Sequence, residues 1–421
     1  MLATDRHEAE ALGARFLRVR ATTEELCAPL SAEDSVVQSM PDASPSKWHL
    51  AHTSWFFETF VLGPLPGYQP LSAEYAYLFN SYYEALGARH PRAARGLLSR
   101  PSLEEVKAYR RHVTEGLFEL LETRRGDVSD LAATIELGIQ HEQQHQELIL
   151  TDIKHLFGSN PVLPAYHLRA QEVSPAPPGL AWHPVAGGIR LLGHQGQGFS
   201  FDNELPRHRE FLESYALGSR LVTNAEYLEF IRDRGYERPE LWLSDGWRVR
   251  TERGWSAPLY WQGEAEGARA VYTLSGVVPL RAEEPVCHVS YYEADAFARW
   301  AGARLPSEAE WENAFRDVPL AGNLLDSGRF HPRAALAKDS EPTQVFGDTW
   351  EWTASAYSAY PGYRPTEGAL GEYNGKFMCN QMVLRGGSCA TPHDHIRPSY
   401  RNFFPPDARW QFSGLRLARS A

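Results

Sequence analysis

Residues 130–157 read DLAATIELGIQHEQQHQELILTDIKHLF, and this stretch decides how the N-terminal part of the chain folds. Apolar residues recur in it at the period of an α-helix, which predicts one buried stripe. The stripe consists of Ile135, Ile139, Ile149 and Ile153. Gly158 and Pro161 follow and predict the end of the helix. The stretch is therefore expected to form one long amphipathic helix.

The chain before this helix has the same helical character. Three patterns predict helix starts: the capping-box pairs Thr22/Glu25 and Ser102/Glu105, and Ser44 directly before Pro45. Four amphipathic helices of this length most simply form a four-helix bundle. We expect such a bundle over residues 1–165.

The remainder of the chain has a different composition. Clustered prolines in residues 166–184 forbid a helix and predict an extended linker. Residues 185–421 are rich in Gly, Trp, Tyr, Asn and Pro, with helices expected only near 224–233 and 291–300. The predicted fold class is α+β, with the helical bundle followed by a loop-rich domain built on small sheets.

Bulk composition excludes several classes of protein. Hydrophobic residues make up 43% and charged residues 23% of the 421 residues, which is typical of a globular chain. The net charge of −11 and the lack of a dense basic run argue against a nucleic-acid partner. With no 18-residue apolar run and no signal peptide, no membrane partner and a cytoplasmic location are expected. The four cysteines lack CxxC spacing, so neither a disulfide framework nor a thiolate zinc site is indicated.

His141 and His145 carry the strongest chemical signal. They are four residues apart on one predicted helix, so both imidazoles can reach a single ion. A histidine pair on a solvated helix face is the alternative interpretation. The spacing also satisfies HExxH, the zinc metalloprotease pattern, with Glu142 as general base. No third-ligand motif such as HxxGxxH follows, which argues against that hydrolase.

A third ligand is available from the segment KWHLAHTSWFFE at residues 47–58. His52 shares a helical face with Trp48 and Trp55, and His49 has similar access, so the spacing leaves both open. Three neutral imidazoles leave open positions on an octahedral metal, which suits Fe(II) that binds substrate and dioxygen together. Zinc remains possible on ligand chemistry alone.

The C-terminal half resembles the formylglycine-generating-enzyme family, a C-type-lectin-like fold, and the N-terminal half resembles the DinB-type four-helix bundle. The matching motifs are PVCHVSYY at 285–292, GARLPSEAEWE at 302–312, GDTWEWT at 347–353, LRGGS at 384–388 and GLRLAR at 414–419. Both halves together, with HxxxH on the last bundle helix, are similar to the sulfoxide synthase family of ergothioneine biosynthesis.

This resemblance implies an activity and a cofactor. Members of the family use iron(II) and dioxygen to join a cysteinyl thiol to hercynine, which is Nα-trimethylhistidine, giving a hercynylcysteine sulfoxide. The family's iron ligands correspond to His52, His141 and His145, and its substrate-facing glutamine corresponds to Gln144. The implied partners are therefore the small molecules hercynine, cysteine and dioxygen, and no obligate protein partner is indicated.

Further substrate residues follow from the same resemblance. Asn402 matches the hercynine-contacting asparagine, and Phe403 and Phe404 have aromatic faces that attract a trimethylammonium group. Family members that use γ-glutamylcysteine have an aspartate where this chain has Phe404. Free cysteine is therefore the expected sulfur donor.

The segment NSYYEALGARHPR at residues 80–92 supplies the remaining candidates. Tyr82 and Tyr83 match a tyrosine pair of the cysteine-using branch, and a phenol near the iron can donate a proton. Arg89 and Arg92 are candidates for binding a substrate carboxylate. Two rival functions remain: an ovothiol-type synthase, which couples cysteine to plain histidine, and a binding module without iron.

Overall fold

The computed structural model describes residues 2–123, 129–169, 176–196, 198–263, 270–336 and 341–421, and it divides into two compact units. The helical unit comprises residues 1–160 and a short later segment, 367–373. The mixed unit comprises residues 161–366 and 374–421. Segment 367–373 thus belongs with the helices, although it follows them by about 200 residues and no local pattern predicts this.

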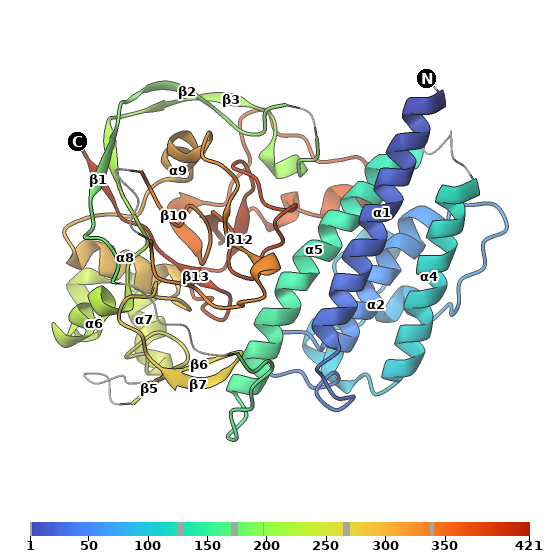
Figure 1. Cartoon of the computed structure of the whole chain (residues 1–421), viewed down its shortest axis with the longest axis horizontal. Helices are drawn as coiled ribbons and strands as arrows, with labels where there is room; N and C mark the ends of the chain where they lie inside the picture. Colours follow the sequence, from blue (N-terminus) through green and yellow to red (C-terminus); the bar gives the residue numbers. More distant parts are fainter. Residues whose placement is uncertain (1, 124–128, 170–175, 197, 264–269, 337–340) are drawn as a thin grey trace. The chain divides into compact units, whose positions relative to one another are not determined.

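The four longest helices described in the helical unit form a bundle, and Figure 1 shows them side by side. These are α1 (Leu2–Cys27), α2 (Ser46–Phe57), α4 (Leu103–Thr123) and α5 (Ser129–Gly158). A π-helical turn, η1 (Glu58–Leu62), extends α2, and the short α3 (Tyr75–Leu78) follows it. The predicted stripe of α5 is buried, since Ile135, Ile139, Ile149 and Ile153 are at most 3% exposed. The expected bundle is confirmed.

Of the three predicted helix starts, one is confirmed, one is wrong and one is shifted by a residue. The Ser102/Glu105 box is present: Ser102 N donates to the Glu105 carboxylate at 2.7 Å, and Glu105 N donates to Ser102 Oγ at 3.3 Å. The start predicted at Thr22 is wrong, because α1 runs through it while its apolar face continues to Leu26. Helix α2 begins at Ser46, one residue after the expected position.

In its described residues, the mixed unit contains small sheets and four α-helices. Its central sheet has the strand order β12 (Asn402–Phe404), β11 (Met382–Arg385), β10 (Trp350–Ala356) and β13 (Ser413–Gly414). A second sheet has the order β1 (Trp182–Val185), β4 (Tyr215–Gly218) and β14 (Ala418–Ser420). A third has the order β5 (Trp261–Gln262), β6 (Ala270–Thr273) and β7 (Gly276–Pro279).

Two ribbons and the helices complete this unit. The ribbons are β2 (Gly188–Leu192) with β3 (His208–Leu212), and β8 (Gly322–Asn323) with β9 (Phe346–Gly347). The helices are α6 (Asn224–Arg232), α7 (Ser244–Arg253), α8 (Tyr291–Trp300) and α9 (Glu308–Phe315). The two expected helices are α6 and α8; the other two were missed because they are short and strongly charged. The α+β class is confirmed.

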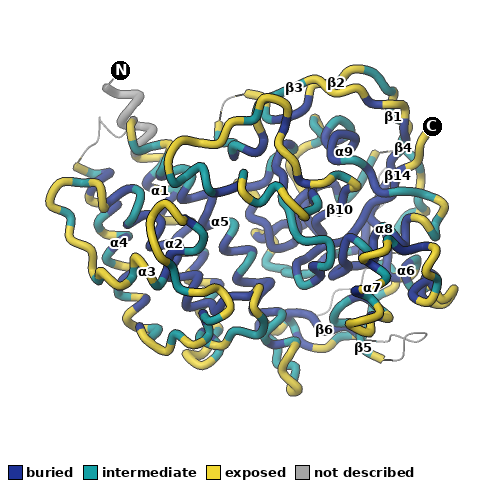
Figure 2. The backbone as a smooth tube through the Cα atoms, turned by 180° about the vertical axis from the view of Figure 1, so that it is seen from behind, coloured by how far each residue is buried: buried dark blue, intermediate teal, exposed yellow. Residues whose placement is uncertain are grey.

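Figure 2 shows the buried interior of the mixed unit in dark blue. Charged side chains and tryptophans are among its buried residues. Arg416 donates to both carboxylate oxygens of Glu351, at 2.9 and 3.0 Å, and Trp311 Nε1 donates to the same carboxylate at 2.9 Å. Arg416 also donates to three backbone carbonyls, those of Gly218, Thr343 and Gln344. One buried guanidinium therefore links four separate segments of the chain.

No helix in the described part of the chain combines the length and the apolar character needed to span a bilayer.

Replacing Arg416 with Met should lower the free energy of unfolding by about 3–5 kcal/mol, because the variant leaves the Glu351 carboxylate buried without its cation. The matched control is Arg248→Met, since Arg248 pairs with Asp245 and Glu252 at the surface. That control should change stability by about 0.5 kcal/mol or less. Urea denaturation followed by tryptophan fluorescence measures both, and equal effects would contradict the assigned role of Arg416.

Candidate metal centre

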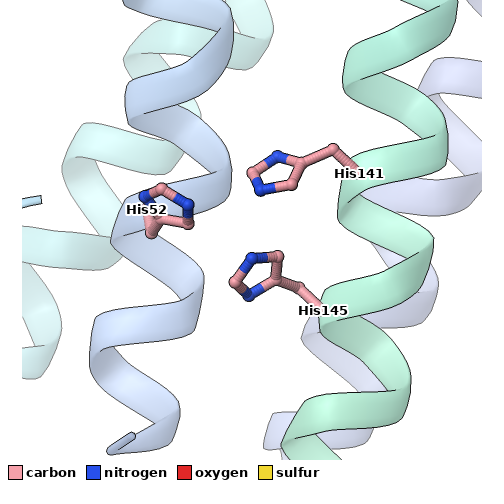
Figure 3. Close-up of side chains that lie close together, drawn as sticks. All are labelled: His52, His141 and His145. Carbon is pink, nitrogen blue, oxygen red and sulfur yellow. The ribbon is translucent and has the colours of Figure 1, made fainter. Parts of the chain in front are cut away.

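Three histidines from two helices of the helical unit converge on one point (Figure 3). His52 lies on α2, and His141 and His145 lie one turn apart on α5. One ring nitrogen from each lies within 4.8 Å of the others, and all three side chains are buried. The i, i+4 spacing places two imidazoles of α5 together, and α2 contributes the third imidazole of the cluster.

Hydrogen bonds at the outer ring edges leave inner nitrogens available for a metal. His52 Nδ1 lies 2.6 Å from the carbonyl oxygen of Phe79, so Nδ1 carries the proton and Nε2 presents a lone pair. Among the described residues, His52 Nε2 and both ring nitrogens of His141 have no hydrogen-bond partner. Buried imidazole nitrogens without partners are costly, and a metal ion would satisfy one such nitrogen on His52 and one on His141. The residues present therefore fit a metal.

The protonation state of the cluster also suits a metal. Burial lowers the pKa of His52 and His145 well below the usual value, and neighbouring imidazoles lower it further. Burial lowers the pKa of His141 to about 3, although the Glu142 carboxylate opposes the shift. All three rings are consequently neutral at pH 7, which is the form that binds a metal.

His49, the alternative third ligand, lies outside this cluster. Its Nδ1 lies 2.7 Å from Nδ1 of His145, and its Nε2 lies 3.0 Å from Oδ2 of Asp152. His49 therefore contacts the outer edge of a cluster histidine, while His52 contributes a nitrogen to the cluster itself.

Glu142 does not have the surroundings of a general base. Its Oε2 accepts a hydrogen bond from Arg20 Nη1 at 3.1 Å, and its Oε1 accepts one from Arg110 Nη2. Burial alone would raise the pKa of Glu142, but the two guanidinium groups outweigh it and lower the pKa to about 2. A carboxylate held this firmly in its ionised form is a poor proton acceptor. This arrangement argues against the HExxH hydrolase interpretation.

Gln144 lies beside the cluster and contacts a residue that sequence analysis missed. The Tyr373 hydroxyl donates to Gln144 Oε1, and the ring of Tyr373 lies 5.7 Å from that of His141, nearly perpendicular to it. Tyr373 belongs to segment 367–373, which the Glu372 carboxylate anchors by accepting from the backbone N–H groups of Glu84 and Ala85. No sequence signal links Tyr373 to a helix more than 200 residues earlier.

Tyr82 and Tyr83 lie together in the same region. Their ring centroids are 4.9 Å apart, and the ring of Tyr82 also lies 6.0 Å from that of Tyr373 in an edge contact. Tyr83 is fully buried with its ring 5.5 Å from that of Trp55. Burial raises the pKa of both phenols, so both retain their protons at neutral pH.

The two predicted arginines have other partners. Arg89 pairs with Glu84 at the surface, at 2.7 Å, and Arg92 donates to the carbonyl oxygen of Asp42. The buried guanidinium of this region is Arg95, which lies 3.3 Å from the ring centroid of Trp48. Trp48 in turn stacks on His52, with centroids 4.5 Å apart. Arg95 was not among the predicted residues, because its contact with Trp48 is a tertiary one.

The remaining predicted residues lie on β12 of the mixed unit. Phe403 stacks on Tyr357 with centroids 4.0 Å apart, whereas Phe404 makes an edge contact with Trp410. Successive residues of a strand point to opposite faces, so the expectation that both rings face one cation is wrong. Asn402 Oδ1 accepts from the backbone N–H of Phe403 at 2.9 Å.

Comparison with known proteins agrees with this architecture. Residues 15–149 match the DinB superfamily, and residues 182–341 and 342–421 match the sulfatase-modifying factor enzyme 1-like domain. The chain is also 29% identical to the formylglycine-generating enzyme of Streptomyces coelicolor over 58% of its length, covering 94% of that protein. Both expected domain types are confirmed.

Relatives that match nearly the whole chain identify the family more closely than the separate domain matches do. The chain is 34% identical to the hercynine oxygenase of Mycolicibacterium smegmatis, covering 90% of this chain and 92% of that protein. It is 33% identical to the hercynine oxygenase of Mycobacterium tuberculosis, covering 97% and 98%. The resemblance inferred from the motifs is thereby confirmed, and the chain belongs to the hercynine oxygenase family.

Proposed function

We propose that this protein is an iron(II)- and dioxygen-dependent sulfoxide synthase that joins the sulfur of cysteine to the imidazole ring of hercynine. The observation that carries the proposal is the buried cluster of His52, His141 and His145 in a chain 34% identical to a hercynine oxygenase. The product is hercynylcysteine sulfoxide, an intermediate of ergothioneine biosynthesis.

The reaction balances with dioxygen as the only oxidant. The ring C–H bond of hercynine and the S–H bond of cysteine break, and one C–S bond and one S–O bond form. One oxygen atom of O2 enters the sulfoxide and the other leaves as water. His52, His141 and His145 would hold the iron, which would supply the redox chemistry of the reaction.

The protein's own residues position the substrates and hold protons. Gln144 offers an amide beside the cluster that can orient the hercynine imidazole. Tyr82 and Tyr83 keep their protons at neutral pH because burial raises the pKa of each phenol, so each can donate a hydrogen bond and can give up its proton only to a strongly basic group formed during the reaction. In this proposal the phenol pair directs oxidation of sulfur toward carbon–sulfur coupling.

The remaining assignments concern substrate recognition. Asn402, with Phe403 or Phe404, is proposed to contact hercynine, and Arg89 and Arg92 are proposed to bind the cysteine carboxylate. Arg89 would first have to exchange its present partner, Glu84. Phe404 offers no charge to a substrate ammonium group, which supports free cysteine as the donor rather than γ-glutamylcysteine.

Protein reconstituted anaerobically with Fe(II) should consume oxygen and form the sulfoxide from hercynine and cysteine. The parallel mixtures are hercynine with γ-glutamylcysteine and histidine with cysteine, all analysed by oxygen electrode and mass spectrometry. Turnover with γ-glutamylcysteine alone would contradict the donor assignment. Turnover with histidine alone would move the protein to ovothiol-type chemistry, and no oxygen uptake with any pair would reject the proposed function.

Replacing His141 with Ala should abolish iron retention and product formation together, because one of three ligands is lost. We expect iron affinity to fall by more than about 100-fold, the upper end of the effect of losing an outer-sphere partner. The matched control is His155→Ala on the same helix, where His155 Nδ1 contacts Ser39 Oγ. Iron content after gel filtration measures both variants. Normal iron content in His141→Ala would reject the three-histidine assignment.

The double variant Tyr82→Phe/Tyr83→Phe should lose sulfoxide formation by about 100-fold while iron content stays unchanged, because both proton donors are removed and the rings remain. The single variants identify the acting phenol. Initial rates of product formation and iron analysis check this. A double variant with the wild-type rate of sulfoxide formation would contradict a role for the pair.

A further inference from the structure

A chain of polar groups runs outward from the metal cluster through His145, His49 and Asp152. His145 and Asp152 lie seven residues apart on α5, about 10 Å along the helix axis, so they cannot contact each other directly. His49, from α2, lies between them at 2.7 Å from His145 Nδ1 and 3.0 Å from Asp152 Oδ2. All three side chains are at most 7% exposed.

The carboxylate determines the direction of both hydrogen bonds. An ionised carboxylate can only accept a hydrogen bond, so Nε2 of His49 must carry the proton and donate the hydrogen bond to Asp152 Oδ2. The His49 ring is then left with an unprotonated Nδ1, which accepts from Nδ1–H of His145. His145 in turn is left with an unprotonated Nε2. One carboxylate therefore selects the tautomers of two imidazoles and leaves the second nitrogen of His145 free for a metal.

Asp152 is itself held in place. The backbone N–H of Ser44 donates to its Oδ2 at 2.8 Å, the same oxygen that accepts from His49. The other cluster histidines have weaker outer support. His52 Nδ1 bonds to a neutral carbonyl, that of Phe79, and neither nitrogen of His141 has a partner among the described residues. The three rings thus differ in how strongly each is oriented.

We propose that His49 and Asp152 are positioning residues that hold His145 in its metal-binding tautomer and increase the electron donation of its Nε2. Hydrogen bonds of this kind orient a ligating imidazole and raise its basicity. The inference rests on the proposed metal site but not on the proposed substrates, and it applies to any divalent ion bound by the cluster.

The first test measures Fe(II) affinity without substrates, by anaerobic competition with a chromophoric chelator. Asp152→Ala and His49→Phe should each weaken Fe(II) binding about 10- to 100-fold. The matched control is Thr151→Val, because Thr151 is buried beside Asp152 on α5 and its hydroxyl bonds to the Leu148 carbonyl. That control should stay within about twofold of the wild type. Folded variants that bind Fe(II) like the wild type would overturn the proposal.

A second measurement uses only wild-type protein, so it tests the proposal even if the variants do not fold. Nitrogen-15 NMR of histidine-labelled wild-type protein, metal-free and loaded with Zn²⁺, reports which ring nitrogen carries a proton. His145 should be protonated at Nδ1 and His49 at Nε2. A proton on Nε2 of metal-free His145, or metal bound through Nδ1, would overturn the proposal.

The two proposals fail separately. Wild-type protein that binds Fe(II) and shows the expected tautomers but forms no sulfoxide would reject the proposed function and leave the positioning role intact. Sulfoxide formation by the wild type, with unchanged Fe(II) affinity in Asp152→Ala and His49→Phe, would reject the positioning role and leave the proposed function intact.

Discussion

The helical unit depends on the burial of three neutral imidazoles where α2 meets α5. Burial lowers the pKa of each ring, so the cluster stays uncharged and coordinating at neutral pH. The same burial leaves ring nitrogens of His52 and His141 without partners among the described residues. Metal binding would relieve that cost, so folding and metal binding are expected to support each other.

Helix α5 separates this neutral cluster from a charged one by its geometry. Adjacent residues on a helix point about 100° apart, so Glu142 faces away from His141 and toward Arg20 and Arg110. These arginines come from α1 and α4, which the buried carboxylate ties to α5. One short sequence, HEQQH, therefore supplies both a metal site and an electrostatic link between helices.

Support around the cluster comes from several parts of the chain. The Phe79 carbonyl orients His52, and the stacked Trp48 and Trp55 rings hold that imidazole from both sides. Segment 367–373 contributes Tyr373 beside Gln144, although residues of the mixed unit precede and follow it in the chain. The mixed unit has its own centre, where Arg416 neutralises Glu351 beside Trp311.

Sequence alone determined the features that depend on local spacing: the helical bundle, the buried stripe of α5, and the placement of His141 and His145 on one face. It could not separate His49 from His52, because residues three apart share a helix face and only packing decides which ring reaches the cluster. Tyr373, Arg95 and the Asp152–His49 contact were likewise set by tertiary structure. Contacts between residues distant in sequence follow from how helices pack, and no local period encodes that packing.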